Sequence, residues 1–228
     1  MSAEPARSAS DTPPRSSRRR GRPPGPSAQG ADTRERILRV ATEVFAEKGY
    51  HGTGVAEIGE RAGIKRGALY YHIASKEELL FEVMRPHIEE VLAEAERIAA
   101  SDLDPAEKLR RLMVHQVCTI AQRRAEVIIY FRDFDALKGE RGAQLQQLRQ
   151  RVEAAWRKVL EEGHEQGLFV SGDHVTVDGI LGLVNWVYLW YRPEGELEPE
   201  EIAERYVALV LRGLLTDRGR RRKRRTAA

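Results

Sequence analysis

Apolar residues recur along most of the chain at the spacing of an α-helix. Between residues 32 and 49 they stand at Ile37, Val40, Ala41, Val44 and Phe45, the i, i+3, i+4, i+7, i+8 order of an amphipathic helix. The same period predicts eight further helices, at 55–62, 65–71, from 75 and from 104 onward, and at 127–137, 145–162, 175–191 and 199–215. Only residues 168–170 are a candidate strand. We therefore predict an all-α fold of about nine helices.

Residues with strong positional preferences mark the ends of these helices. Asp32 is a candidate N-cap for the first one, and Gly49 ends it. Ser75, followed three residues later by Glu78, is the capping-box pattern that opens a long helix. Pro86 lies inside that helix and should kink it, because proline has no backbone donor.

Charge divides the chain into an acidic body and two basic ends. The net charge of the 228 residues is only +3, but residues 1–31 hold six Arg against two acids, and residues 218–228 hold six Arg and one Lys with no acid. Residues 32–217 therefore carry a net charge of −8. Basic, low-complexity ends favour a polyanion partner, although they would also serve solubility. We expect disorder in 1–31 and 218–228, and two folded domains at 32–78 and 79–217.

Several classes of protein are disfavoured by what the sequence lacks. The longest uncharged run, 179–191, is shorter than the ~20 residues of a membrane helix, and no stretch resembles a secretory signal. The single cysteine, Cys118, fits a reducing compartment. The sequence holds no nucleotide loop, nucleophile elbow or paired metal-binding spacing. We expect a soluble, cytoplasmic protein that is not an enzyme and uses no cofactor or metal.

Residues 54–76, GVAEIGERAGIKRGALYYHIASK, carry the strongest functional signal. Two short helices with a turn at Gly63, where a positive φ is permitted, form a helix-turn-helix unit whose second helix fits the DNA major groove. Ala62 would keep the two helices close, and Leu69 would face the small core, leaving basic and tyrosine side chains toward DNA. The alternative is a three-helix packing motif with no DNA role.

Residues 33–76 resemble the DNA-binding domain of the TetR family of one-component regulators. The stretches that carry the resemblance are FAEKGY, VAEIGERAGI and GALYYHIASKEELL. It implies a phosphate contact by Thr53, next to which Gly54 replaces a hydroxyl residue that many relatives have. It also implies base contacts by Arg66, Gly67 and Tyr70, contacts of Tyr71 and His72 to the DNA backbone, and a phosphate contact by Lys76. Lys65 faces DNA by its place at the start of the second helix, opposite Leu69.

The N-terminal arm holds a second DNA signal. Arg20-Gly21-Arg22-Pro23 is similar to the core of an AT-hook, in which an extended Arg-Gly-Arg lies in a narrow A·T minor groove. The alternative is a generic basic tail. The C-terminal run RGRRRKRR favours a nonspecific electrostatic anchor or an unstructured extension over a specific site.

The larger domain carries candidate features for dimerisation and ligand binding. The apolar segment 180–191 and an apolar stripe on the last helix would pack against a second copy with two-fold symmetry. Aromatic residues between 130 and 191 would line an apolar cavity or belong to the core, and the polar Arg132, Asp133 and Asn185 would orient a ligand or pair with one another. The stripe is Ile202, Tyr206, Leu209, Val210 and Leu214, and the candidate ligand contacts are Tyr130, Phe134, Trp156, Trp186 and Trp190.

Three stretches of this domain resemble the TetR branch that represses fatty-acid and steroid catabolism. They are VIIYFRDF, WRKVLEEGHEQGLF and WYRPEGELEPEEIAERYVALVLRGL. The ligands of that branch are CoA thioesters, but its sterol-type members have an Arg where this chain has Gly182. The resemblance implies a homodimeric repressor that binds a palindromic double-stranded DNA operator and is released by a small lipophilic, acyl-CoA-like effector. The alternative is a nonspecific DNA-binding architectural or adaptor protein.

Overall fold

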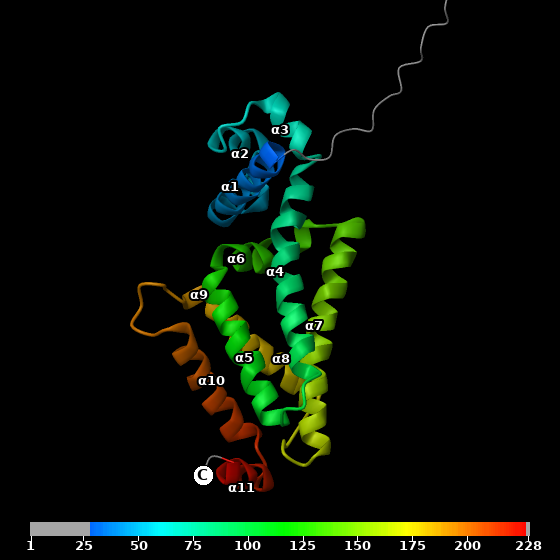
Figure 1. Ribbon diagram of the computed structural model, residues 1–228, viewed down its shortest axis with the longest axis vertical. Helices are drawn as coiled ribbons and strands as arrows, with labels where there is room; N and C mark the ends of the chain where they lie inside the picture. Colours follow the sequence, from blue (N-terminus) through cyan, green and yellow to red (C-terminus); the bar gives the residue numbers. More distant parts are fainter. Residues whose placement is uncertain (1–27, 227–228) are drawn as a thin grey trace, which may run out of the picture.

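The computed structural model describes residues 28–226 and is helical almost throughout. The first three helices form a small domain at one end, and the long fourth helix runs from it into a larger domain (Figure 1). None of the described helices is long and apolar enough to cross a membrane. The helices are α1 (Ala28–Gly52), α2 (Val55–Arg61), α3 (Arg66–His72), α4 (Lys76–Ala99), α5 (Pro105–Gln122), α6 (Arg124–Asp133), the 3-10 helix η1 (Phe134–Ala136), α7 (Gly139–Glu165), α8 (His174–Asn185), α9 (Val187–Trp190), α10 (Pro199–Leu214) and α11 (Asp217–Thr226).

The all-α prediction is confirmed, with eleven α-helices in the described part where the sequence predicted about nine. One addition arises because the predicted helix 175–191 breaks at Trp186 into α8 and α9. The other is α11, which spans Asp217–Thr226 in the basic tail, where the sequence analysis expected no helix. Arg and Lys are good helix formers. The Thr216 hydroxyl supports the first turn of α11 by accepting a hydrogen bond from the Gly219 N–H at 3.1 Å.

Most helix ends follow the residues that marked them in the sequence. The Ser75 hydroxyl accepts a hydrogen bond from the Glu78 N–H at 3.0 Å, which confirms the N-cap of α4. Gly49 leaves the helical conformation with a φ of 76°, where the first helix was expected to end. Asp32 is not an N-cap, because α1 already begins at Ala28 and Asp32 lies in its second turn. Alanine ahead of Asp32 is the strongest helix former, which explains the earlier start.

The small domain has an apolar core between its three helices and the start of α4. Leu69 of α3 is fully buried in this core, as expected. It packs against Gly59 of α2, where an added Cβ would lie 2.9 Å from Leu69 Cδ2. The close approach of the two helices therefore lies at Gly59 rather than at Ala62. Gly63 takes a φ of 66° in the turn between them. The side of α3 that faces away from Leu69 and the core is left free.

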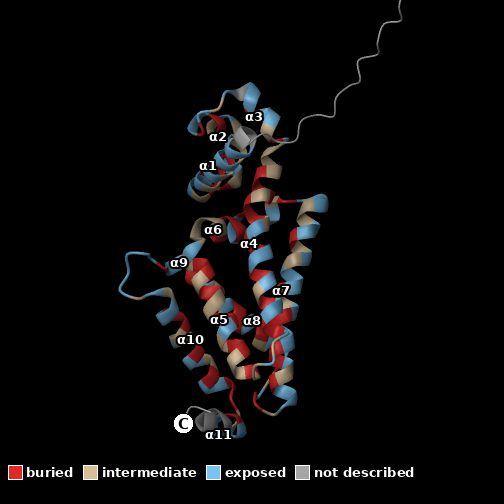
Figure 2. Cartoon of the chain, in the orientation of Figure 1, coloured by how far each residue is buried: buried red, intermediate tan, exposed pale blue. Residues whose placement is uncertain are grey.

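The larger domain is built around α4 and α5. Helix α7 lies beside α4, and α10 packs against α5, with buried residues along the facing sides (Figure 2). Helix α6 contacts α1, so it connects the larger domain to the small one. Outside the helices, the residues that the structure describes form a single isolated β-bridge, between Phe169 and Leu215. The candidate strand 168–170 is thus reduced to one bridge beside the end of α10.

Candidate DNA interface and effector cavity

Helix α3 presents its outer side to solvent at one tip of the molecule (Figure 2). Tyr71 is 87% exposed and Tyr70 is 52% exposed, unusually high values for aromatic side chains. Lys65, at the N-cap position, is exposed, and a Cβ added to Gly67 would meet nothing within 4 Å. Arg66 is the first residue of α3, and its side chain lies outside the described part. The predicted recognition face is therefore free to approach another molecule.

Thr53 and Lys76, the two residues outside α3 that were predicted to contact phosphates, make hydrogen bonds within the small domain. Thr53 is buried, and its hydroxyl donates to the Gly49 carbonyl at 2.7 Å. The Lys76 Nζ donates to the carbonyls of Tyr50 and Thr53 at 3.0 and 2.9 Å, and it lies 4.3 Å from the centre of the Tyr50 ring. Thr53 and Lys76 thus hold the connection between α1 and α2 against the start of α4.

Arg34, which the sequence analysis did not single out, also fixes the recognition helix. Its Nη1 donates to the His72 carbonyl at the end of α3 at 2.5 Å, and its Nη2 lies 3.3 Å from Glu78 Oε1. The His72 ring meets the Tyr71 ring edge-on, with centroids 5.3 Å apart. Arg34 therefore joins α1, α3 and α4. The predicted AT-hook residues Arg20 and Arg22 lie outside the described residues.

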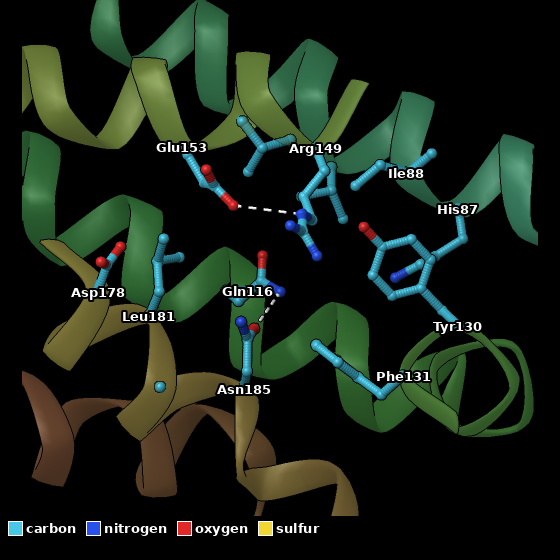
Figure 3. A pocket seen from close by; sticks show the side chains of 13 residues that line it. His87, Ile88, Gln116, Tyr130, Phe131, Arg149, Glu153, Asp178, Leu181 and Asn185 are labelled. Carbon is cyan, nitrogen blue, oxygen red and sulfur yellow. Dashed lines mark hydrogen bonds and ion pairs between the residues drawn. The ribbon is translucent and has the colours of Figure 1, made fainter. Parts of the chain in front are cut away.

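The larger domain contains a cavity of about 260 Å³ between α4, α5, α6, α7 and α8 (Figure 3). Its apolar lining residues are Ile88, Val91, Phe131, Val152 and Leu181. Polar groups reach it as well: Gln116 donates to Asn185 Oδ1 at 2.8 Å, and Arg149 lies 3.4 Å from Glu153 Oε1. This mixture of apolar wall and a few convergent polar groups is typical of a small-molecule site.

The structure brings one of the five predicted aromatic ligand contacts, Tyr130, to the cavity wall. Phe134 packs edge-on against the Tyr130 ring at 5.2 Å, behind the wall. Trp156 is fully buried in the core, whereas Trp186 and Trp190 are exposed, and none of the three lines the cavity. Of the predicted polar groups Asn185 does line it. The clustering of aromatic residues in the sequence identified the region of the cavity. It did not show which of the rings face the cavity and which face the core or the solvent.

His87 and Tyr130 stand side by side on the cavity wall, with ring centroids 6.0 Å apart. Burial lowers the pKa of His87 to about 4, and the positive charges of Arg123 and His115 act in the same direction. Burial also raises the pKa of the Tyr130 hydroxyl, with Glu153 adding to the rise and Arg149 opposing it. Both side chains are therefore uncharged at neutral pH.

Arg132 and Asp133, at the end of α6, pair with one another instead of facing the cavity. The Arg132 Nη2 lies 3.0 Å from Asp133 Oδ2, and Asp133 is only 7% exposed. The guanidinium also donates to two carbonyls near the end of α1, those of Ala46 at 3.1 Å and of Phe45. A helix leaves its last carbonyls unpaired, so Arg132 acts as a clasp between the two domains. It follows Tyr130 and Phe131 of the cavity wall directly along the chain.

The predicted dimerisation stripe on α10 is divided between two roles. Ile202 and Leu214 are buried in their own chain, where α10 packs against α5. Leu209 is exposed, and so are Val175 of α8 and Trp186 at the junction of α8 and α9. The stripe combined residues of two neighbouring helix faces, because a one-dimensional pattern does not separate packing within a chain from packing between chains.

Comparison with known proteins identifies the family. Residues 37–83 match the family described as bacterial regulatory proteins, tetR family, and residues 102–214 match the tetracyclin repressor-like, C-terminal domain. The HTH-type transcriptional repressor KstR2 of Mycobacterium tuberculosis is 32% identical over 186 residues, which cover 79% of this chain and 92% of that protein. The chain belongs to the TetR family of transcriptional regulators. Its helix-turn-helix is the DNA-binding unit of this TetR protein.

Solved TetR structures share the fold over nearly their whole length. The ketosteroid transcriptional regulator KstR2 of Mycobacterium tuberculosis superposes with a TM-score of 0.76 at 30% identity, covering 81% of this chain and 95% of that one. AibR, solved in complex with isovaleryl coenzyme A and operator DNA, superposes with a TM-score of 0.70 at 30% identity, covering 78% and 97%. The resemblance to the TetR branch that controls fatty-acid and steroid catabolism, noted in the sequence, is thereby confirmed.

Proposed function

We propose that this TetR-family protein is a homodimeric repressor that binds a palindromic operator in the cytoplasm and is released by a lipophilic, acyl-CoA-like effector. The observation that carries the proposal is the position of the cavity. Helix α4 begins where the recognition helix ends and forms one wall of the cavity with His87, Ile88 and Val91. A ligand that displaces α4 therefore displaces α3, and changes the spacing of the two recognition helices in a dimer.

The exposed side of α3 supports the DNA part of the proposal. Its two tyrosines and its open N-terminal part leave room for base edges and for the sugar-phosphate backbone. To contact a phosphate, the Lys76 ammonium would have to turn away from the two carbonyls to which it donates. The Thr53 hydroxyl is buried and would have to become exposed. The proposed contacts are Arg66, Gly67 and Tyr70 to bases, Lys65, Tyr71, His72 and Lys76 to the backbone, and Arg20 and Arg22 to an adjacent minor groove.

The exposed faces of α8 and α10 support the dimer. Leu209 of α10 and Trp186, directly after α8, are exposed, and an added Cβ at Gly179 or Gly213 would meet nothing within 4 Å. Large exposed apolar side chains beside small residues form a surface onto which another helix pair can pack closely. Two-fold symmetry would place these faces against their own copies and align two α3 helices with a palindrome.

The size of the cavity limits which part of an acyl-CoA it would hold. A 150 Å³ protein cavity binds one benzene, so about 260 Å³ accommodates about ten non-hydrogen atoms. The acyl group would therefore lie inside, against Tyr130 and the Phe134 ring behind it, and the coenzyme would lie outside. Gly182, on the cavity wall, leaves open the space that an Arg fills in sterol-type members of the branch.

Selection of binding sites from randomised DNA duplexes tests the DNA part of the proposal. We expect a palindromic consensus with half-sites about one helical turn apart, and Tyr70→Ala should lose it. An architectural protein would instead return no consensus. Native mass spectrometry of the purified protein should report a dimer and the mass of any co-purified ligand. An acyl-CoA panel titrated against the operator complex should include members that lower operator affinity 5- to 150-fold, as a coupling of about 1–3 kcal/mol implies.

A further inference from the structure

Two buried polar groups on the cavity wall lack hydrogen-bond partners. His87 is 4% exposed and Tyr130 is 5% exposed. Within the part of the chain that the structure describes, neither His87 Nδ1 nor the Tyr130 hydroxyl has a hydrogen-bond partner. Figure 3 shows the Tyr130 hydroxyl pointing into the cavity, on the side from which Arg149 enters. The two side chains come from different helices, α4 and α6, so the cavity brings them together.

Leaving these groups unpaired is unfavourable, and packing does not require them. A buried donor or acceptor without a partner costs about 1–3 kcal/mol. Phenylalanine in place of Tyr130 would fill the same ring volume, and it would keep the edge-on contacts with Phe131 and Phe134, whose centroids lie 5.3 and 5.2 Å away. The ring packing therefore does not require the hydroxyl, and a molecule that fills the cavity can supply its hydrogen-bond partner.

The charges around the pair define that partner. Because the imidazole of His87 and the phenol of Tyr130 are both uncharged at neutral pH, they offer hydrogen bonds without a counter-charge. A carboxylate placed against them would lose its hydration. Arg149, which lines the cavity, already faces Glu153 at 3.4 Å, and Asp178 also lines the cavity. A ketone or hydroxyl oxygen has no such penalty.

We propose that His87 and Tyr130 form a subsite for an uncharged oxygen, a ketone or a hydroxyl, on the acyl group of the effector. This inference rests on the proposed function and narrows its effector class. The surrounding Ile88, Val91, Val152 and Leu181 cover the carbon skeleton, while the pair binds the oxygen. An unsubstituted alkyl chain of the same size fills the cavity but leaves both groups unpaired. The protein therefore distinguishes an oxygenated acyl group from a plain fatty acyl group.

Calorimetric titration with matched thioesters tests the subsite. The probes are octanoyl-CoA and octanoyl-CoAs that carry a keto or hydroxyl group at each position of the distal half of the chain. We expect at least one oxygenated probe to bind about tenfold more tightly than octanoyl-CoA. This ratio corresponds to about 1.4 kcal/mol, which is the size of the contribution expected from the recovered hydrogen bonds. Equal or weaker binding of every oxygenated probe overturns the subsite and leaves the proposed function intact.

Tyr130→Phe is the decisive variant, because it removes only the hydroxyl. It should abolish the preference for the oxygenated probe, leave octanoyl-CoA binding unchanged and not lower the free energy of unfolding. A hydroxyl with a structural role would instead lower that free energy. The matched control is Tyr188→Phe, whose ring stacks on Phe131 at 4.9 Å without lining the cavity. This control should keep the preference, and a Tyr130→Phe protein that also keeps it refutes the proposal.

A second pair of probes separates the subsite from the thioester class. Methyl hexyl ketone and n-octane are compared by their effect on the thermal midpoint of the wild type and of Tyr130→Phe. If no thioester binds but the ketone stabilises only the wild type, the acyl-CoA assignment fails and the subsite stands. If neither the thioesters nor the ketone discriminates between the two proteins, the subsite fails as well.

Discussion

Replacing Arg132 with alanine should loosen the small domain from the larger one. The Arg132 guanidinium pairs with Asp133 at 3.0 Å and donates to the carbonyls of Ala46 and Phe45 near the end of α1. Helix α6, which carries it, also provides Tyr130 and part of the cavity wall. The substitution therefore removes polar contacts between the domains without touching the cavity.

The size of the effect follows from the exposure of the two partners. Hydrogen bonds from charged donors contribute about 1.5–3 kcal/mol each, but the Arg132 side chain is 39% exposed, so the low end applies. Removing it also leaves the buried Asp133 carboxylate without its cation, which costs more than the loss of an exposed pair. We expect the free energy of unfolding to fall by about 2–4 kcal/mol.

Urea denaturation followed by circular dichroism measures this loss. The control is Arg151→Ala, which breaks an ion pair with Glu96 at 2.7 Å between side chains that are 58% and 46% exposed, and which should cost less than about 1 kcal/mol. Adding Asp133→Asn to Arg132→Ala should recover part of the loss, since the unpaired carboxylate is gone. Equal destabilisation by Arg132→Ala and Arg151→Ala would show that the clasp contributes no more than a surface pair.

Four further outcomes are expected. Arg66→Ala should reduce the preference for operator over scrambled DNA by about 1–3 kcal/mol in anisotropy titrations, while Lys76→Ala should weaken binding to all sequences alike; operator affinity unchanged by Arg66→Ala would exclude a base contact. Removing residues 1–27 should weaken operators with A·T flanks more than those with G·C flanks, and equal loss would indicate a purely electrostatic tail. Gly59→Ala should cost about 1–3 kcal/mol in denaturation, because its Cβ would lie 2.9 Å from Leu69 Cδ2; a neutral result would mean that Leu69 moves freely. The free energy of unfolding should fall by about 1.6 kcal/mol between pH 6.5 and pH 5, because the unfolded chain protonates His87 near its usual pKa while the folded chain holds that pKa at about 4; His87→Gln should lose this contribution, and an equal slope in both proteins would contradict it.

The parts of the fold that depend on residues close together in the sequence were predictable. The apolar period located nine helices, and the Ser75 and Glu78 pair placed the start of α4 correctly. The small domain was predictable in most detail, since its turn at Gly63 and its inward Leu69 depend on short-range geometry. Asp32 misled because a residue favoured at N-caps is also tolerated inside a helix when good helix formers precede it.

Contacts between residues far apart in the chain were not predictable. Lys76 reaches carbonyls 23 and 26 residues away, and Arg132 reaches carbonyls 86 and 87 residues away. Backbone carbonyls are present at every residue, so no sequence pattern marks them as partners. Tyr130 was found because aromatic residues are dense around it, but the same density also marked the core residue Trp156 and the surface residue Trp186. His87 was not among the predicted ligand contacts.

Helix α4 belongs to both domains, so the end of the first family match does not coincide with a structural boundary. The tetR family match ends at residue 83, inside α4, which continues to Ala99. Leu79 and Leu80 are buried near the small domain, and Val91 and Leu92 are buried farther along the same helix. Because α4 is one continuous helix with buried residues in both domains, unfolding either end of it exposes apolar surface. The two domains should therefore unfold cooperatively. A chimera joined at residue 83 would cut this shared helix, whereas a joint in the loop after Ala99 would leave it whole.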